Sequence, residues 1–101
     1  MAIDKGYVNA IYNYAYLLQD SQNYEEAIKY YKMAIEKGHA ESMHNYAYML
    51  EYGIGIEKNP EEAIKYYKMA IDKGVPNSMN YYALMLQNGE GCEVDYKEAI
   101  K

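Results

Sequence analysis

The chain repeats itself, and this repetition restricts the folds it can adopt more than any other feature of the sequence. Residues 25–38 read EEAIKYYKMAIEKG and residues 61–74 read EEAIKYYKMAIDKG, so two nearly identical segments begin 36 residues apart. A second block, NYAYLL at residues 13–18, returns in related form at residues 45–50 and 81–86. Periods of roughly 20 to 50 residues are typical of proteins that stack one small structural unit. The sequence therefore predicts a repeat protein.

Each unit is expected to contain two helices, which we call helix A and helix B in chain order. Helix B begins with a clear start signal, because Asn59 can cap the helix, Pro60 suits the first helical position, and Glu62 follows three residues after the cap. Asn23 and Asp95 occupy the same position in the other two units. Helix A is expected over residues 9–19, 40–52 and 76–88.

Glycines divide the chain into units, because a glycine after a helix can adopt the left-handed conformation that ends it. Gly38 and Gly74 follow helix B of their units, and Gly6 follows the same tail sequence. We expect one repeat domain with four parts. These are the tail of a preceding repeat at residues 1–6, a first repeat at 7–38 with a short A–B loop, a second repeat at 39–74, and a third at 75–101 that ends within helix B.

The apolar residues of helix B recur at helical spacing and predict how the units associate. Ala27, Tyr31 and Ala34 form a stripe along one side, and charged residues occupy the other side. One pair of short helices cannot bury such a stripe by itself, whereas neighbouring pairs can bury it between them. The sequence thus predicts an all-α fold of stacked helical hairpins.

Charge and composition argue against several classes of function. The formal net charge is −5 and all ten cationic residues are lysine, whereas nucleic-acid binding requires clustered Lys and Arg. No apolar segment approaches the roughly 20 residues that span a bilayer, and the first residues lack the apolar core of a signal peptide. Cys92 is the single cysteine, which favours a reducing compartment. We expect a cytoplasmic protein that binds neither nucleic acid nor membranes.

No residue pattern indicates catalysis, a metal site or a cofactor. The two histidines, His39 and His44, have no set of three or four ligands near them in sequence, and Cys92 occupies the position of the apolar loop residue Ile56. The Gly53-Ile54-Gly55 segment lacks the preceding strand and the following Lys-Ser/Thr of a phosphate-binding loop, so it predicts a turn. We expect a protein that is not an enzyme and uses no cofactor.

The spaced small, aromatic and glycine residues resemble the Sel1-like repeat family, a relative of the tetratricopeptide repeat with a longer A–B loop. In the second unit the matching residues are Ser42, Tyr46, Ala47, Leu50, Gly53, Gly55, Ala63, Tyr67, Ala70 and Gly74. The third unit matches through Ser78, Tyr82, Ala83, Leu86, Gly89, Gly91 and Ala99. Two features depart from the pattern: alanine stands at Ala47 and Ala83 where the family more often has glycine, and the first unit lacks the Gly-x-Gly loop.

This resemblance implies a right-handed α–α superhelix, with helix A on its concave side, that serves as a scaffold or adaptor for other proteins. The helix A residues directed away from helix B would then contact the partner. They are Asn9, Tyr12, Tyr16, Gln19, Glu41, His44, Tyr48, Glu51, Tyr52, Asn77, Asn80, Leu84 and Gln87. Because this set contains no Lys or Arg, a neutral or basic protein segment is favoured as the partner.

Two alternatives remain open at this point. The tyrosines of helix A could pack between neighbouring units and only stabilise the stack, since amphipathic aromatic residues often cover the edges of a core. The chain could also be a structural element that associates end to end with other copies and has no separate ligand, because the outer units of a stack expose faces that neighbours would cover.

Overall fold

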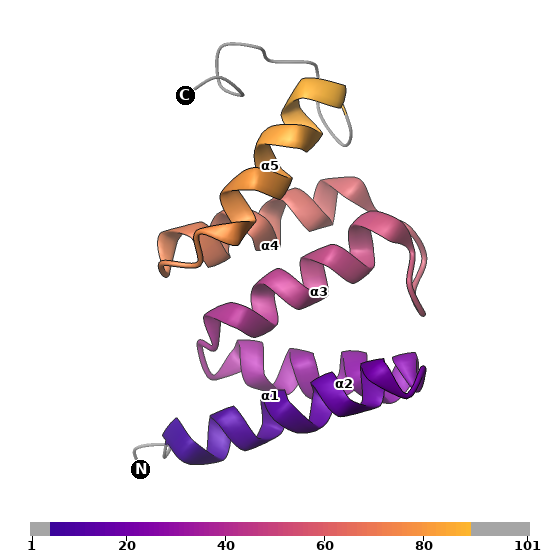
Figure 1. Cartoon of the computed structure of the whole chain (residues 1–101), viewed down its shortest axis with the longest axis vertical. Coiled ribbons are helices and arrows are strands. Elements are labelled where there is room, and N and C mark those ends of the chain that lie inside the picture. Colours follow the sequence, from indigo (N-terminus) through magenta and orange to yellow (C-terminus); the bar gives the residue numbers. More distant parts are fainter. Residues whose placement is uncertain (1–4, 90–101) are drawn as a thin grey trace.

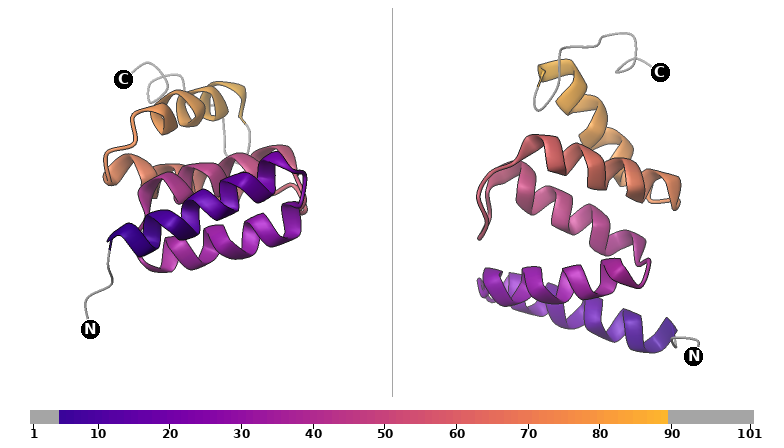
Figure 2. Two further views of the ribbon diagram at one scale, coloured as in Figure 1. Left: turned by 60° about the horizontal axis from the view of Figure 1, so that its bottom comes forward. Right: turned by 180° about the vertical axis from the view of Figure 1, so that it is seen from behind.

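The computed structural model describes residues 5–89, which form five helices connected by short turns (Figure 1). The helices are α1 (Lys5–Asp20), α2 (Tyr24–Glu36), α3 (Ala40–Tyr52), α4 (Pro60–Asp72) and α5 (Asn77–Asn88). α1, α3 and α5 are the A helices, and α2 and α4 are the B helices. They stack in chain order along the long axis, from α1 at one end to α5 at the other (Figure 2). The predicted all-α solenoid is confirmed.

The predicted side-chain cap is present at the start of α4 and absent at the start of α2. The Asn59 side chain accepts a hydrogen bond from the backbone N–H of Glu62 at 3.2 Å, and Pro60 occupies the first turn of α4, as predicted. Asn23 precedes α2 at the equivalent position, but its side chain makes no capping hydrogen bond. The short loop before α2 holds Asn23 at φ −88° and ψ 66°, whereas Asn59 lies at φ −144° and ψ 83°.

Two of the three predicted closing glycines end a helix, and the third does not. Gly38 (φ +83°) and Gly74 (φ +92°) adopt the left-handed conformation after α2 and α4, as predicted. Gly6 differs, because it lies in the first turn of α1, which begins at Lys5. Glycine is tolerated within a helix when the flanking residues favour it, so the same dipeptide can end one helix and begin another. Residues 1–4 lie outside the described residues.

The two A–B loops differ in length and in how they turn. The loop between α1 and α2 contains residues 21–23, whereas the loop between α3 and α4 contains residues 53–59. In the long loop Gly55 has φ +70° and packs so closely on Tyr24 that an added Cβ would overlap the tyrosine side chain. In the short loop Gln22 has φ +65°, a conformation that side chains rarely adopt. The long loop of the second unit thus packs against the first residue of α2.

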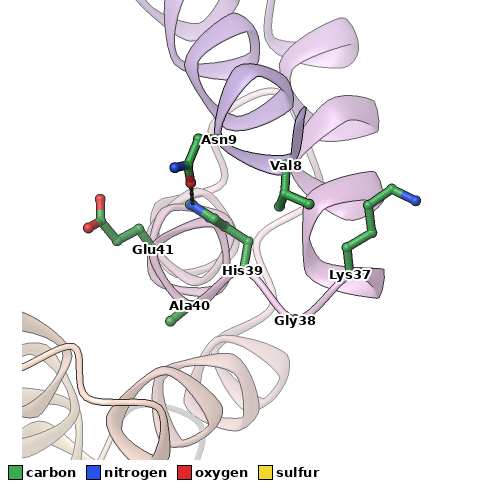
Figure 3. Close-up of a pocket in the computed structure, with 7 residues that line it drawn as sticks. All are labelled: Val8, Asn9, Lys37, Gly38, His39, Ala40 and Glu41. Atoms are coloured by element: carbon green, nitrogen blue, oxygen red, sulfur yellow. Dashed lines mark hydrogen bonds between the residues drawn. The ribbon is translucent and has the colours of Figure 1, made fainter. Parts of the chain in front are cut away.

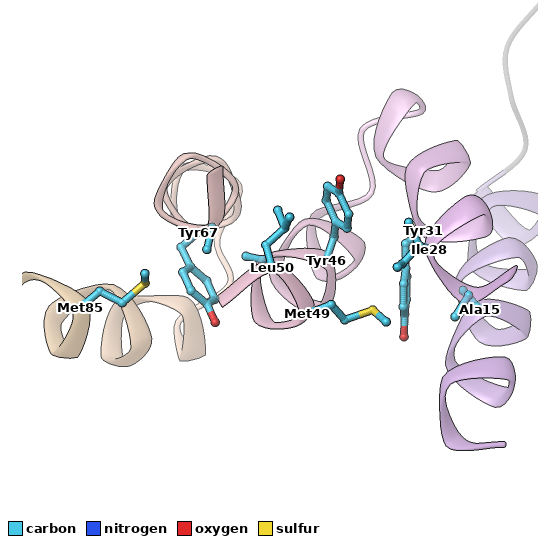
Figure 4. Close-up of a cluster of buried hydrophobic side chains, with 11 residues drawn as sticks. Ala15, Ile28, Tyr31, Tyr46, Met49, Leu50, Tyr67 and Met85 are labelled. Carbon is cyan, nitrogen blue, oxygen red and sulfur yellow. The ribbon is translucent and has the colours of Figure 1, made fainter. Parts of the chain in front are cut away.

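The larger of two clusters of buried side chains runs through the stacked units (Figure 4), and a smaller one of Val8, Ile11 and Ala34 lies between α1 and α2. The rings of Tyr31 and Tyr67, which are equivalent residues of α2 and α4, are completely buried. Alanines at the helix crossings, such as Ala27 and Ala63, are also completely buried and allow the helices to approach closely. In Figure 4 the hydroxyls of Tyr31 and Tyr67 point to one side of this row, and that of Tyr46 points to the other. The core tyrosines therefore place polar groups at both edges of the apolar layer.

Candidate functional site

Most of the residues expected to contact a partner are accessible on the A helices. The exposed ones are Asn9, Tyr16, Glu41, Tyr52, Asn77, Asn80, Leu84 and Gln87. The half-buried ones are Tyr12, Gln19, His44 and Tyr48. We call these twelve residues the helix A surface. Glu51, the thirteenth, is buried.

Glu51 was expected on the accessible surface, and its side chain is only 5% exposed instead. Its carboxylate accepts a hydrogen bond from the Tyr67 hydroxyl at 2.7 Å. Burial and the adjacent Glu51 raise the pKa of Tyr67 well above its ordinary value. Residue spacing alone placed Glu51 on the accessible side of α3, which is wrong. It does not reveal that the long ring of Tyr67 reaches this position from within the core.

The helix A surface contains a hollow of about 370 Å³ between α3 and the turn that precedes α5. It brings together Tyr12, Glu41, His44 and Asn77, four residues from three different A helices. The remaining lining consists of Asn45, Gly74, Val75 and Pro76. We call this the central hollow. A hollow of this size can hold the side chains of a bound segment.

Two further hollows flank the central one. The first, of about 480 Å³, lies beside the turn between α2 and α3 and is lined by Asn9, His39 and Glu41 among others (Figure 3). We call it the N-terminal hollow. The second, of about 260 Å³, lies beside the long loop and is lined by Tyr16 and Gln19 among others. Seven of the expected residues therefore line at least one of these three hollows.

Hydrogen bonds fix the side chains between the first and second units. The amide nitrogen of Asn45 donates to the hydroxyls of Tyr12 at 3.3 Å and Tyr31 at 3.1 Å. The Tyr31 hydroxyl in turn donates to the side-chain oxygen of Gln19 at 2.6 Å. Burial raises the pKa of Tyr31 to about 12. Gln19 and Tyr12 are thus held in place, which reduces the conformational entropy that they would lose on binding.

His44 joins the second unit to the third. Its Nδ1 atom lies 2.7 Å from the hydroxyl of Ser78, a completely buried residue of α5. Its ring lies against Tyr81 at 5.2 Å and Tyr67 at 5.5 Å between centroids. Burial lowers the pKa of His44 below its ordinary value, although the Glu41 carboxylate acts in the opposite direction. At neutral pH the imidazole is therefore uncharged.

His39 fixes the turn before α3 in a related way. Its Nδ1 atom accepts from the backbone N–H of Ser42 at 3.2 Å, and its Nε2 atom lies 3.2 Å from the amide oxygen of Asn9. Because an accepting Nδ1 carries no proton, Nε2 must carry it and donate to Asn9. Burial lowers the pKa of His39. Sequence reasoning did not identify His39, because a capping role depends on the conformation of the turn.

Contacts between neighbouring A helices are displaced from simple equivalence, by one residue for Tyr12 with Asn45 and by three residues for Tyr48 with Tyr81. Tyr12 contacts Asn45 rather than stacking in a straight column with its equivalent, His44. Tyr48 packs on Tyr81 with perpendicular rings at 5.8 Å. The sequence could not give this displacement, because it depends on the crossing angle of the helices. Tyr12 and Tyr48 thus help to hold the stack together, whereas Tyr16 and Tyr52 are 52% and 55% exposed.

Within residues 5–89 the structure contains no group of three or more His, Cys, Asp or Glu side chains that could hold a metal ion. The same residues include no helix that is both long and apolar enough to cross a membrane. The Gly53-Ile54-Gly55 segment forms a turn, with both glycines at positive φ. Cys92 and the predicted helix start at Asp95 lie outside the described residues.

Comparison with known proteins identifies relatives of this chain. A family model described as Sel1 repeat matches it three times, at residues 8–39, 40–75 and 76–101. Among solved structures, the crystal structure of a Sel1 repeat protein from Oxalobacter formigenes is 30% identical in sequence, with a TM-score of 0.85. The match covers 92% of this chain and 40% of that protein, so the chain spans less than half the length of this relative. No curated protein matches the chain.

Proposed function

The chain belongs to the Sel1 repeat family, and on that basis we propose that its helix A surface binds a segment of another protein. Sel1 repeats generally mediate protein–protein interactions, and proteins built from them are typically non-enzymatic scaffolds. The finer proposal is that this chain acts as a scaffold or adaptor module. Its single cysteine suits a reducing compartment, and we propose the cytoplasm.

The central hollow is the observation that carries this proposal. Three A helices contribute to it, so a segment lying across the stack would contact several units at once. The same three A helices also expose aromatic and aliphatic side chains, because Tyr16, Tyr52 and Leu84 are each more than half exposed. Tyrosines provide large contact area at a small entropic cost and are common in binding surfaces.

Affinity capture followed by mass spectrometry tests the proposal, with variants chosen to spare the fold. Tyr16→Ser combined with Leu84→Ser removes exposed apolar area from two A helices, and neither residue belongs to the buried core. Tyr14→Ser is the matched control, because Tyr14 is 49% exposed but contacts Tyr30 of a B helix. We expect the double variant to lose partners that both the unaltered chain and the control retain. Retention of every partner by a folded double variant would contradict the proposal.

End-to-end association is a second candidate, supported by one observation on α1. Leu17 is 61% exposed, whereas the equivalent Met49 and Met85 of α3 and α5 are completely buried. Figure 4 shows Met49 directed toward Tyr31 of the preceding helix B. If a second copy supplied the missing cover, sedimentation velocity across a wide concentration range would show larger species, and Leu17→Ser would abolish them. A monomer at all concentrations would exclude this candidate.

A further inference from the structure

We infer that the central hollow receives a basic side chain of the bound segment, preferably an arginine, with the Glu41 carboxylate as its ionic partner. This inference rests on the proposed function, because it specifies the chemistry of the segment bound by the helix A surface. The observations that carry it are the charge, lining and position of the central hollow.

The first observation is that Glu41 is the only charged residue among the described residues that line the central hollow. The other lining residues are aromatic, amide-bearing, apolar or glycine, and no lysine is among them. Glu41 is exposed, and its charge acts on nearby groups: it contributes to the raised pKa of Tyr12, after burial. His44 is uncharged at neutral pH and so does not repel a cation. No residue in the lining therefore opposes the negative charge of Glu41.

The second observation is the position of Glu41 between two hollows. It lines both the central hollow and the N-terminal hollow. In the N-terminal hollow, Lys37 is the one lining cation, and Figure 3 shows its amine on the opposite side from the Glu41 carboxylate. A segment that crosses from one hollow to the other would therefore pass directly beside Glu41.

The third observation is that only one of the three equivalent positions, Glu41, carries a charge. The residues equivalent to Glu41 in the first and third units are Asn9 and Asn77, which are neutral amides. Three repeated positions would bind a repetitive segment in several registers with similar free energy. A single carboxylate distinguishes one register, because only one alignment places a cation opposite it.

The lining favours a guanidinium over an ammonium group. Tyr12 and His44 provide ring surface, and Asn45 and Asn77 provide amide groups around the carboxylate. A guanidinium is planar, stacks on aromatic rings and donates several hydrogen bonds in fixed directions. An ammonium group is more strongly hydrated and gains less from the rings. Arginine is therefore the better match to this hollow.

The test uses two short probes that differ only in charge. These are acetyl-Gly-Arg-Gly-amide and the same peptide with citrulline, a neutral analogue of arginine. Each is titrated into the isotopically labelled chain, and binding is followed by NMR chemical shifts. We expect the arginine peptide to shift the signals of Glu41, His44 and Asn77 and to bind about three- to fivefold more tightly than the citrulline peptide, as for a partly exposed ion pair.

Two variants make the result specific. Glu41→Gln should abolish the preference for arginine without changing the helical signal. Glu61→Gln is the matched control, because Glu61 is also an exposed glutamate in the first turn of a helix but lies on α4. It should retain the preference.

Several results would overturn the inference. They are equal binding of the two peptides, no binding of either, shifts confined to other surfaces, and a preference that persists in Glu41→Gln. None of these results contradicts the proposed function if the Tyr16→Ser, Leu84→Ser double variant still loses partners that the unaltered chain captures. Loss of the proposed function would instead appear as unchanged capture by that double variant. The two failures are therefore distinguishable.

Discussion

Two equivalent tyrosines, Tyr31 in α2 and Tyr67 in α4, have different polar partners although their helices are nearly identical in sequence. The Tyr31 hydroxyl donates to the Gln19 amide oxygen and accepts from Asn45. The Tyr67 hydroxyl donates to the buried Glu51 carboxylate, and its ring stacks on Tyr81 at 5.7 Å with an angle of 11°. Tyr81 occupies in the third unit the position that Asn45 occupies in the second.

The difference shows that the two B helices have nearly the same sequence, whereas the A helices supply different partners to their tyrosines. A buried hydroxyl needs a hydrogen-bond partner in either case. We call the polar contacts of Tyr31 the first junction and those of Tyr67 the second junction. In the first, neutral amides that remain half-buried bond to the tyrosine hydroxyl, and in the second a carboxylate that is withdrawn from solvent does so. A hydrogen bond to a charged acceptor is stronger, but the acceptor is then more sensitive to losing its donor. The second junction should therefore respond more strongly to substitution.

The largest expected effect concerns the loop that only the second unit possesses. Gly55→Ala should lower the free energy of unfolding by about 2–4 kcal/mol, because it adds both left-handed strain and overlap with Tyr24. Urea denaturation measures this change. Gly74→Ala is the control, since Gly74 has φ +92° but nothing lies within 4 Å of an added Cβ. It should cost only the strain, about 1–2 kcal/mol. Equal losses in the two variants would show that the contact with Tyr24 is unimportant.

The next effect compares the two junctions directly. Tyr67→Phe should lower the free energy of unfolding by about 1–3 kcal/mol, because it removes a donor from a buried carboxylate. Tyr31→Phe should lower it by about 0.5–1.5 kcal/mol, because Gln19 and Asn45 are half-buried and can bond to water instead. Both values come from urea denaturation. A larger loss for Tyr31→Phe would reverse our interpretation of the junctions.

The third effect concerns pH, because the turn before α3 is capped by a histidine and the turn before α5 is not. Pro76 is the N-cap of α5 and makes no side-chain hydrogen bond, whereas His39 caps α3 through Nδ1. Burial lowers the pKa of His39 from its ordinary value of 6.5, so the folded state binds this proton more weakly than the unfolded state. The associated stability is therefore present above pH 6.5 and is lost as the pH falls below it.

His39→Asn tests this assignment, because asparagine can cap the helix but does not titrate. The melting temperature of the unaltered chain should fall between about pH 7 and pH 5, and the variant should show a smaller fall. An NMR titration of the His39 ring gives the pKa directly. An ordinary or raised pKa would contradict the proposed cap, since a protonated Nδ1 cannot accept from Ser42.

The smallest expected effect concerns the short loop of the first unit. Gln22 has φ +65°, where a side chain is unfavourable, so Gln22→Gly should relieve strain. Glycine also increases the entropy of the unfolded chain, which offsets part of the gain. We expect a net increase of about 0.5 kcal/mol in the free energy of unfolding. A decrease would indicate that the Gln22 side chain makes a contact more favourable than the strain.

Sequence reasoning succeeded for the features that repeat and failed for those that depend on the three-dimensional packing of helices and turns. Periodicity, the Asn59 cap and the closing Gly38 and Gly74 identified the fold and three of the helix ends, because these signals act within a few residues of chain. The burial of Glu51 and the capping role of His39 were not predicted. The burial of Glu51 depends on how closely the Tyr67 ring approaches from α4, and the capping role of His39 depends on the conformation of the turn. Residue spacing along one helix contains no information on either.

The binding role of the helix A surface stays a prediction, but the structure changes which residues it includes. Tyr12, Glu41, His44 and Asn77 meet in one hollow, although each was chosen only by its position along a helix. Val75 and Pro76 also line the hollow: Val75 lies in the turn, and Pro76, expected as the first residue of helix A, is instead the N-cap of α5. A helical pattern can nominate helix residues only.

The repeated pattern of residues was enough to predict stacked helical hairpins, because duplicated apolar stripes of this period are buried by neighbouring copies of the same unit. Which polar residues remain accessible follows instead from how the helices pack. The packing of helix A on helix B of its own unit sets whether a side chain such as Glu51 meets a buried hydroxyl, and the packing of neighbouring units sets whether one such as Glu41 faces an open hollow. This packing is the combined result of contacts among many residues, so no local segment of the chain encodes it.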